Sequence, residues 1–128
     1  MKKKMMSAED LLKLKFVNYV VMSPDESKVM FTASVVSDDK KKYFSHIYMI
    51  NIDGSDLTQF TSGEVADSSP VFSPDGKWIV FTSKRGEKKG IYRMPTGGGE
   101  AKLLVDKDGS YSELSVSPDS KKIMCVFT

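Results

Sequence analysis

Few residues in this sequence could act as a base or a nucleophile. His46 is the only histidine, so any Ser-His or Cys-His pair would need it as the base. It stands at the entry of the run HIYMI beside a lysine-rich stretch, which indicates a structural or solvent-facing role. Cys125 lies in an apolar strand pattern, where a thiol usually packs as a small hydrophobe, so we expect it in the core. No G-x-S-x-G sequence is present to expose a serine nucleophile, and we predict no catalytic residue and no enzymatic activity for this chain.

Acidic and glycine-rich segments could instead hold a metal or a phosphate. NIDGSD from Asn51 and DKDGSYSE from Asp106 resemble parts of a calcium loop, but glycine takes the fourth position rather than the sixth, and no bidentate glutamate follows correctly. PTGGGE from Pro95 lacks the lysine and serine of a phosphate-binding loop and leads into a strand pattern. We interpret all three as turns, and the sequence predicts no metal and no cofactor.

Two lysine clusters could form a basic patch. Lys40 to Lys42 and Lys88 to Lys89 each fall between two apolar runs, and Tyr43 and Phe44 follow the first cluster. Nucleic-acid readers interleave basic and aromatic residues in this way. The neighbouring acids Asp38, Asp39 and Glu87 dilute both clusters, however, and solvated hairpin tips commonly carry such charges. The sequence therefore predicts no nucleic-acid partner.

Composition indicates a soluble globular chain. Of its 128 residues 40% are hydrophobic, and the 19 basic and 17 acidic residues leave a net charge of only +2. A single cysteine excludes an intramolecular disulfide and favours a reducing compartment, so we expect a cytoplasmic location. Glu9 and Asp10 interrupt the basic opening before an apolar run develops, which argues against a signal peptide. No apolar stretch approaches about eighteen residues, so no membrane partner is expected.

Two phrases repeat along the chain with a common period. SPDESKVMFT from Ser23, SPDGKWIVFT from Ser73 and SPDSKKIMCV from Ser117 are separated by about 50 and about 44 residues. IYMINIDGSDLTQFT from Ile47 and IYRMPTGGGEAKLL from Ile91 are also about 44 residues apart. This period is near the length of one blade of a β-propeller.

Each phrase predicts a local structure. In Ser73-Pro74-Asp75-Gly76 the residue types favour a type I turn, and we expect Glu26 and Ser120 to replace Gly76 in the other copies because the fourth position does not require positive φ. The β-branched and aromatic residues that follow each turn suit buried strands. Asp53-Gly54 and Gly97-Gly98 offer positive φ at adjacent positions, which predicts tight hairpins.

These elements predict an all-β fold of antiparallel four-stranded propeller blades, with two complete blades, the first hairpin of a third, and a short N-terminal helix. Ser7 would cap that helix with Asp10 three residues later, and Leu11, Leu12 and Leu14 would form its apolar face. We expect a tail and helix over 1–15, blade one over 16–62, blade two over 63–108 and an incomplete blade three over 109–128. The expected strands are 17–22, 29–36, 47–52 and 57–60, then 69–73, 78–83, 90–94 and 102–105, with a last pair in ELSVS and KIMCVFT.

The ordered motifs resemble the start of a prolyl oligopeptidase family serine peptidase of the acylaminoacyl-peptidase branch. They are EDLLKLKFV, SPDESKVMFT, HIYMINIDGSDLTQFTSG, SSPVFSPDGKWIVFTSKRG and IYRMPTGGGEAKLL, and together they cover nearly the whole chain. The SPDG phrase alone is equally similar to TolB-type propellers. In the peptidase family a propeller restricts which peptides reach the Ser-Asp-His triad of an α/β-hydrolase domain. This chain departs from that pattern, because it has under half of the usual seven blades and no hydrolase domain.

The resemblance implies two alternative functions. The first is a propeller segment that shapes or gates access to a hydrolase domain, with that domain or a peptide substrate as its partner. The second is a TolB-like module for protein interaction. A helix before the first blade favours the peptidase, because in that family this segment lies against the hydrolase. Two and a half blades cannot close a ring of about four to eight, so we also expect self-association through open blade edges or faces.

Overall fold

The computed structural model describes residues 4–6, 16–36, 42–85, 88–107 and 109–128. Every regular element in this part of the chain is a strand, which confirms the all-β class. The helix expected from Ser7 lies outside the described residues. The strands are β1 (Lys4–Met6), β2 (Phe16–Met22), β3 (Lys28–Val36), β4 (Tyr43–Asn51), β5 (Leu57–Gln59), β6 (Val65–Phe72), β7 (Trp78–Arg85), β8 (Lys88–Pro95), β9 (Lys102–Val105), β10 (Tyr111–Val116) and β11 (Ile123–Phe127).

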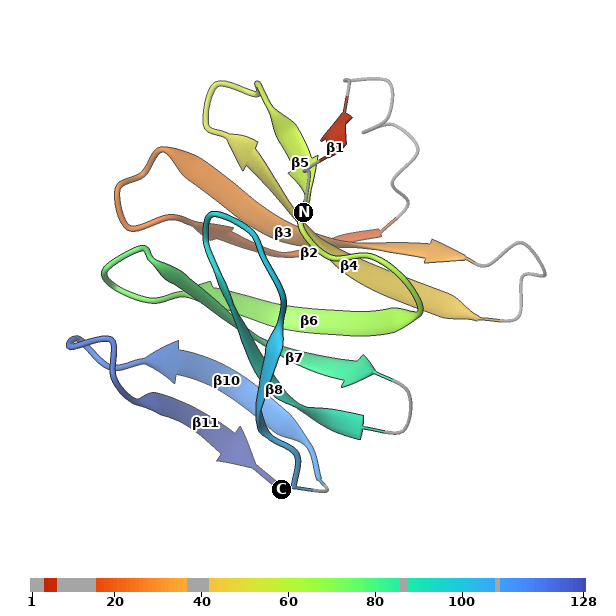
Figure 1. Cartoon of the computed structure of the whole chain (residues 1–128), viewed down its shortest axis with the longest axis vertical. Coiled ribbons are helices and arrows are strands. Elements are labelled where there is room, and N and C mark those ends of the chain that lie inside the picture. The colour runs from red at the N-terminus through yellow and green to blue at the C-terminus, as the bar shows by residue number, and fades with distance from the viewer. Residues whose placement is uncertain (1–3, 7–15, 37–41, 86–87, 108) are drawn as a thin grey trace.

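The strands form three repeats that follow one another through the molecule (Figure 1). The first repeat is the antiparallel series β2, β3, β4 and β5, and the second is the series β6, β7, β8 and β9. The third repeat is the separate pair β10 and β11. A single parallel bridge, Ser45 with Ala66, connects β4 to β6. The antiparallel pairing expected from the sequence is confirmed.

β1 adds a fifth strand to the first repeat. It runs antiparallel to β5, with Met5 opposite Thr58, and so covers the outer edge of that repeat. Sequence reasoning missed this strand, because three residues are too few to show an alternating pattern and its partner is distant in the chain.

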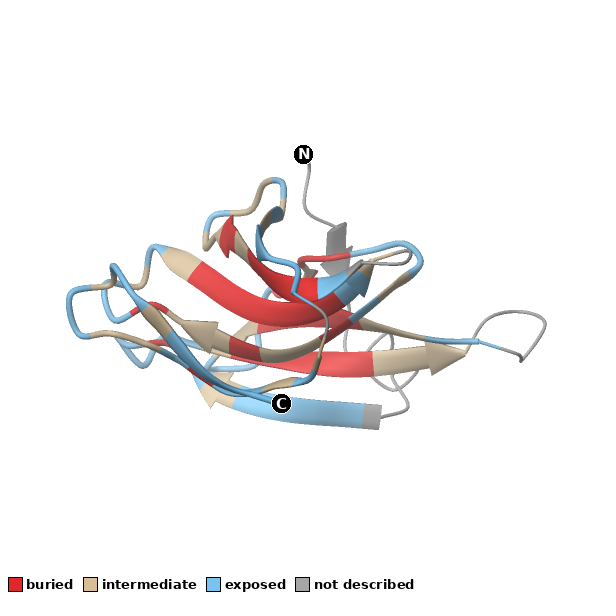
Figure 2. Ribbon diagram, turned by 90° about the horizontal axis from the view of Figure 1, so that it is seen from below, coloured by how far each residue is buried: buried red, intermediate tan, exposed pale blue. Residues whose placement is uncertain are grey.

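The central strands are buried on both faces, which explains their nearly continuous apolar runs (Figure 2). In β7 the side chains of Ile79 and Phe81 are fully buried against the first repeat. Val80, which points to the opposite face, packs with Ile91 and Leu114 toward the third repeat. The middle repeat is therefore held from two sides, by apolar contacts that each remove surface from water.

The largest apolar cluster lies between the first and second repeats. It takes an equal share from each, and its members are Met30, Ile47, Met49, Phe60, Ile79, Phe81, Tyr92 and Met94. A smaller cluster of Phe31, Ala33, Tyr48 and Leu57 lies on the other face of the first repeat, where the rings of Phe31 and Tyr48 stack. These clusters require the side chains of consecutive strand residues to alternate between two interfaces.

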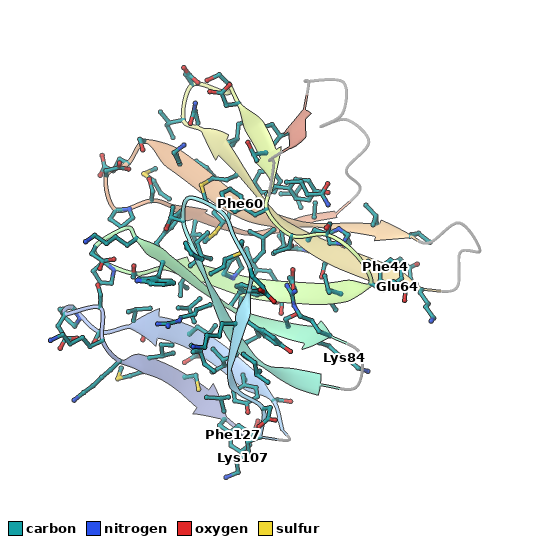
Figure 3. All side chains as sticks on the ribbon, in the orientation of Figure 1. Phe44, Phe60, Glu64, Lys84, Lys107 and Phe127 are labelled. Carbon is teal, nitrogen blue, oxygen red and sulfur yellow. The ribbon has the colours of Figure 1, made fainter. Side chains whose placement is uncertain are left out.

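The third repeat has its own small aromatic contact at the end of its strands. The rings of Tyr111 and Phe127 lie 5.1 Å apart, and Lys107 Nζ lies 5.1 Å from the Phe127 ring centre (Figure 3). Gly109 leaves no space for a side chain here, since an added Cβ would come within 2.5 Å of the Phe127 ring. The contact pins the start of β10 to the end of β11.

The three Ser-Pro-Asp segments, which we call the SPD turns, share one hydrogen-bond network. In the second repeat Ser73 Oγ accepts from Trp78 N–H at 3.0 Å and donates to Asp75 Oδ1 at 2.5 Å. Asp75 Oδ1 also accepts from Lys77 N–H at 2.9 Å. The turns that begin at Ser23 and Ser117 repeat these bonds at corresponding positions. The network explains why serine and aspartate recur: each satisfies backbone groups that the chain reversal leaves unpaired.

The fourth position of each SPD turn is left-handed, which corrects the expectation from the sequence. The φ angle is 74° at Gly76, 62° at Glu26 and 61° at Ser120. The first three residues close an i to i+3 bond as a type I turn does, with Gly76 N–H donating to Ser73 O at 2.9 Å. The next residue then needs positive φ to enter the following strand, so Glu26 and Ser120 occupy a conformation that glycine adopts more easily.

The expected tight glycine hairpins are also wrong in detail. The connection from β4 to β5 spans residues 52–56, and positive φ falls on Gly54 and Asp56. The connection from β8 to β9 spans 96–101, and positive φ falls on Gly98 and Gly99. Both loops are longer than a two-residue hairpin because the strands that they join are offset from each other.

Each first strand of a repeat contains a bulge that the sequence did not reveal. Tyr19, Ser69 and Glu113 have φ of 55°, 53° and 53° and all stand four residues before an SPD serine. The strand register shifts by one residue at each site. Thr82 Oγ1 donates to Ser68 O at 3.0 Å beside the second bulge, and Thr32 serves the first in the same way. The bulge is therefore a built feature of the repeat.

Candidate functional site

His46 is structural, and the solvent-facing alternative is wrong. It lies inside β4 opposite Ala33 and is buried, with an exposed fraction of 6%. Its Nε2 lies 2.8 Å from Gly63 O, so the ring fixes the segment that leads from the first repeat to the second. Among the described residues Nδ1 has no hydrogen-bond partner. His46 thus stabilises the connection between two repeats.

Cys125 is exposed, which contradicts the expected place in the core. Counted from the SPD serine, it takes the position of Phe31 and Phe81, which are both buried. In the described chain β11 pairs only with β10, whereas β3 and β7 each lie between two strands. The residue type and face suit a core, but the neighbouring strands that bury this position in the other repeats are absent there.

A buried ionic cluster joins the first two repeats. Asp67 is fully buried on β6, and its Oδ1 accepts from Ser83 Oγ at 2.5 Å and from Arg85 at 3.2 Å. The Arg85 guanidinium lies 5.5 Å from the Phe81 ring centre and 5.1 Å from that of Tyr92, which adds cation–π contacts. A buried carboxylate needs such partners because burial without them is very unfavourable.

The first repeat reaches this cluster through one hydrogen bond. Ser45 Oγ donates to the backbone oxygen of Asp67 at 2.7 Å, next to the parallel bridge between β4 and β6. Sequence reasoning missed Asp67 and Arg85 as a pair. An acid within an apolar strand pattern was a usable signal, but nothing local showed that Arg85, at the end of another strand, would answer it.

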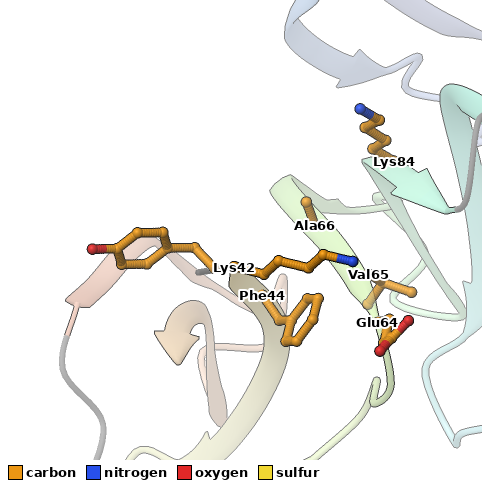
Figure 4. Close-up of a pocket in the computed structure, with 7 residues that line it drawn as sticks. Lys42, Phe44, Glu64, Val65, Ala66 and Lys84 are labelled. Carbon is orange, nitrogen blue, oxygen red and sulfur yellow. The ribbon is translucent and has the colours of Figure 1, made fainter. Parts of the chain in front are cut away.

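A cleft opens at the end of this seam, and we call it the rim cleft (Figure 4). Its volume is about 380 Å³. The start of β4, the start of β6 and the end of β7 line it, through Lys42, Tyr43, Phe44, Glu64, Val65, Ala66 and Lys84. The strands β4 and β6 pair only at Ser45 and Ala66, and their divergence beyond that bridge creates the opening.

The lining residues combine charge with apolar surface. Lys42 extends across the opening toward the segment that carries Glu64, and the Phe44 ring lies beside Glu64 (Figures 3 and 4). Lys84 borders the cleft from β7. Ammonium groups bind carboxylates, and an aromatic ring offers an apolar contact, so the cleft is suited to charged polypeptide groups. None of the lining residues is a serine, cysteine or histidine.

The lysine clusters of the sequence fall only partly in this site. Lys42 lines the cleft, Lys89 is exposed on β8, and Lys40 and Lys41 lie outside the described residues. Among the residues described, no three His, Cys, Asp or Glu side chains gather closely enough to hold a metal ion. The part of the chain that the structure covers also contains no helix long and apolar enough to span a membrane.

The titratable groups with the clearest perturbation belong to the SPD turns. Hydrogen bonds from the Ser27 side chain, the Ser23 side chain and the Ser27 backbone lower the pKa of Asp25 to about 2. The pKa values of Asp75 and Asp119 are lowered for the same reason, first by the Ser73 and Ser117 hydroxyls. These shifts report turn geometry, because each donor also fixes the hairpin.

The repeated hairpins and their shared turn network define a β-protein built from propeller-type repeats. Residues 14–128 match the family model of the TolB beta propeller domain. The chain belongs to this family.

Relatives include both peptidases and TolB proteins. The chain is 32% identical over 123 residues to the uncharacterized peptidase YuxL of Bacillus subtilis, a match that covers 95% of this chain and 19% of that protein. It is 30% identical to TolB from Acinetobacter baumannii, with a TM-score of 0.69 over 84% of this chain and 26% of the other. An acylaminoacyl peptidase of Pyrococcus horikoshii shares the fold, with a TM-score of 0.69 at 18% identity over 91% of this chain and 18% of the other. The chain thus spans about a fifth of the length of the peptidase relative.

Proposed function

We propose that this chain is the non-catalytic N-terminal propeller segment of an acylaminoacyl-peptidase-like serine hydrolase. Its three repeats correspond to two complete blades and the first hairpin of a third. The segment shapes or gates the access of peptides to a hydrolase domain that lies outside this chain. The observation that carries the proposal is the similarity to a peptidase over 95% of this chain, which spans only 19% of that relative.

The rim cleft supports a role in access. It lies where two repeats diverge, and Lys42, Lys84 and Phe44 offer contacts that a peptide carboxylate and an apolar side chain can use. The partners proposed are therefore the hydrolase domain and a peptide substrate. We also propose a cytoplasmic location, for which the single cysteine is the support.

A chimera tests this function. The 123-residue segment matched in the Bacillus subtilis peptidase is replaced by this chain, and cleavage of short N-acylated peptides is compared with cleavage of long ones. We expect the chimera to keep the size selection of its parent, while a deletion of the segment loses it. The isolated chain should hydrolyse neither substrate. A folded, active chimera whose size selection equals that of the deletion would contradict the proposal.

Charge variants of the chimera test the rim cleft itself. Lys84→Glu should lower the cleavage of acidic peptides relative to neutral ones, because the ammonium group is replaced by a carboxylate. Lys121→Glu is the matched control, since it lies in the SPD turn of the third repeat at the opposite end of the strands. Equal effects of the two variants would show that only net charge matters.

The alternative function is a TolB-like module for protein interaction. It is favoured by the likeness to the TolB of Acinetobacter baumannii, which at 30% identity is close to that of the peptidase relative. Calorimetric titration of this chain with the separately produced hydrolase portion of the Bacillus subtilis peptidase distinguishes the two. Binding favours the peptidase segment, and its absence together with a chimera that lacks size selection favours the interaction module.

A further inference from the structure

The interface between the first and second repeats provides a template for a further contact. We call the side of a repeat that faces the preceding one its front face and the opposite side its back face. The front face of the second repeat carries Ile79 and Phe81, each with an exposed fraction of 0%. They pack on the back face of the first repeat, where Met30 and Ile47 are equally buried.

The front face of the first repeat carries equivalent residues without a repeat against it in the described chain. Counted from the SPD serine, Val29 and Phe31 take the positions of Ile79 and Phe81. A cavity of about 440 Å³ opens over Val29, Phe31 and Ile50. Val17 and Ile52, which also line the cavity, have exposed fractions of 47% and 58%.

The back face of the third repeat shows the complementary surface. Met124 takes the position of Met30 in the first repeat and Val80 in the second, whose exposed fractions are 0% and 3%. Met124 itself has an exposed fraction of 67%, and the nearby Val126 has one of 45%. The same side of the repeat that is buried twice within the chain is therefore open in its third copy.

We propose that the back face of the third repeat in one molecule packs on the front face of the first repeat in a second molecule. Met124 of one copy enters the cavity over Val29 and Phe31 of the other, as Met30 approaches Ile79 and Phe81 within the chain. This contact continues an interface that the chain already forms, and removal of both apolar surfaces from water drives it. It concerns this chain as a molecule and does not depend on the proposed role beside a hydrolase.

The contact is head-to-tail, because the two molecules use different surfaces. Such a contact leaves one free face at each end, so assembly continues until the curvature of the repeats closes a ring or an open chain forms. Closed propellers contain about four to eight blades, which two or three copies of this chain would supply. The association buries strand faces and does not require the edge of β11 to pair.

Two surface variants and one matched control test the proposal. Met124→Asp places a carboxylate on the back face, and Ile52→Asp places one on the front face. Tyr43→Asp is the control, because Tyr43 has an exposed fraction of 66% and lies at the rim cleft, away from both faces. Sedimentation velocity over a dilution series measures association, and circular dichroism verifies that each variant is folded.

We expect the unmodified chain and Tyr43→Asp to associate alike, and each of the other variants to associate about tenfold more weakly or less, since a carboxylate at an apolar contact lacks a partner. An equimolar mixture of Met124→Asp and Ile52→Asp should form a 1:1 dimer, because each retains the face that the other lacks. A monomeric unmodified chain overturns the proposal. So does a result in which only one face matters, which indicates a symmetric contact, or a mixture that stays monomeric.

Discussion

At the scale of single residues, the fourth position of the SPD turn separates backbone conformation from side-chain contact. An added Cβ at Gly76 would meet nothing within 4 Å, so its φ of 74° is the only structural reason for glycine there. Glu26 holds almost the same conformation, with φ of 62°, and its side chain is exposed. The first repeat therefore carries backbone strain that the second avoids.

Glu26→Gly should raise the free energy of unfolding by about 0.5–1 kcal/mol, which is the strain removed less the entropy that glycine loses on folding. Gly76→Ala should lower the free energy by a similar amount. Lys77→Gly is the control, because this exposed neighbour lacks positive φ and glycine can only weaken it. Urea unfolding measures all three, and a destabilised Glu26→Gly variant would show that the glutamate side chain matters more than its φ.

Gly90 illustrates the opposite case. Its φ is ordinary, but an added Cβ would collide with the backbone oxygen of Val105, so the neighbouring strand β9 leaves no space for a side chain. The sequence cannot distinguish such a glycine from a turn glycine, because the obstacle comes from a strand that lies further along the chain, beyond a loop. The two glycines have different causes although both interrupt similar patterns.

At the scale of elements, the SPD hairpins should lose stability in acid. The pKa of Asp25 is about 2 when folded and 3.8 without its hydrogen-bond partners, so the carboxylate form stabilises the fold. The contribution is complete above about pH 4 and is lost as the pH falls through about 2. Ser27→Ala removes the largest cause of the shift, and it should raise the pKa of Asp25 toward 3.8.

NMR titration of the Asp25 carboxyl in the unmodified chain and in Ser27→Ala measures this shift. Asp75 serves as the internal control, because its donors are Ser73 and Lys77 and do not include Ser27. An unchanged Asp25 titration in Ser27→Ala would refute the assignment, while a parallel change at Asp75 would indicate a general loss of structure instead.

The elements were predictable from sequence to the extent that their causes are local. The SPD phrase carries its own donors and acceptors, and the strands after it are marked by residues such as Ile79 and Phe81. The bulge at Ser69 depends on a threonine in the facing strand, and the Asp67–Arg85 pair joins two strands. The rim cleft needs two repeats to diverge. These features arise between segments, so no single stretch of sequence contains them.

At the scale of the molecule, the two seams between repeats differ in strength. The first buries a cluster drawn from both sides and adds the Asp67 network and the hydrogen bond from His46 to Gly63. The second holds the two-stranded third repeat through Leu114, packed with Val80 and Ile91. Two strands alone are marginally stable in water, so this repeat depends on the second seam.

Hydrogen exchange should therefore be fastest in β10 and β11 and slowest in β3, β4, β7 and β8, because local opening follows the weaker packing. Leu114→Ala should remove most of the remaining protection in β10 and β11, since truncation of a buried leucine costs about 2–5 kcal/mol. The central strands should keep theirs. Leu104→Ala is the matched control, because Leu104 has an exposed fraction of 37%. Equal exchange in all three repeats, or equal loss in all of them upon Leu114→Ala, would mean that the chain opens as one cooperative unit and that the seams do not differ.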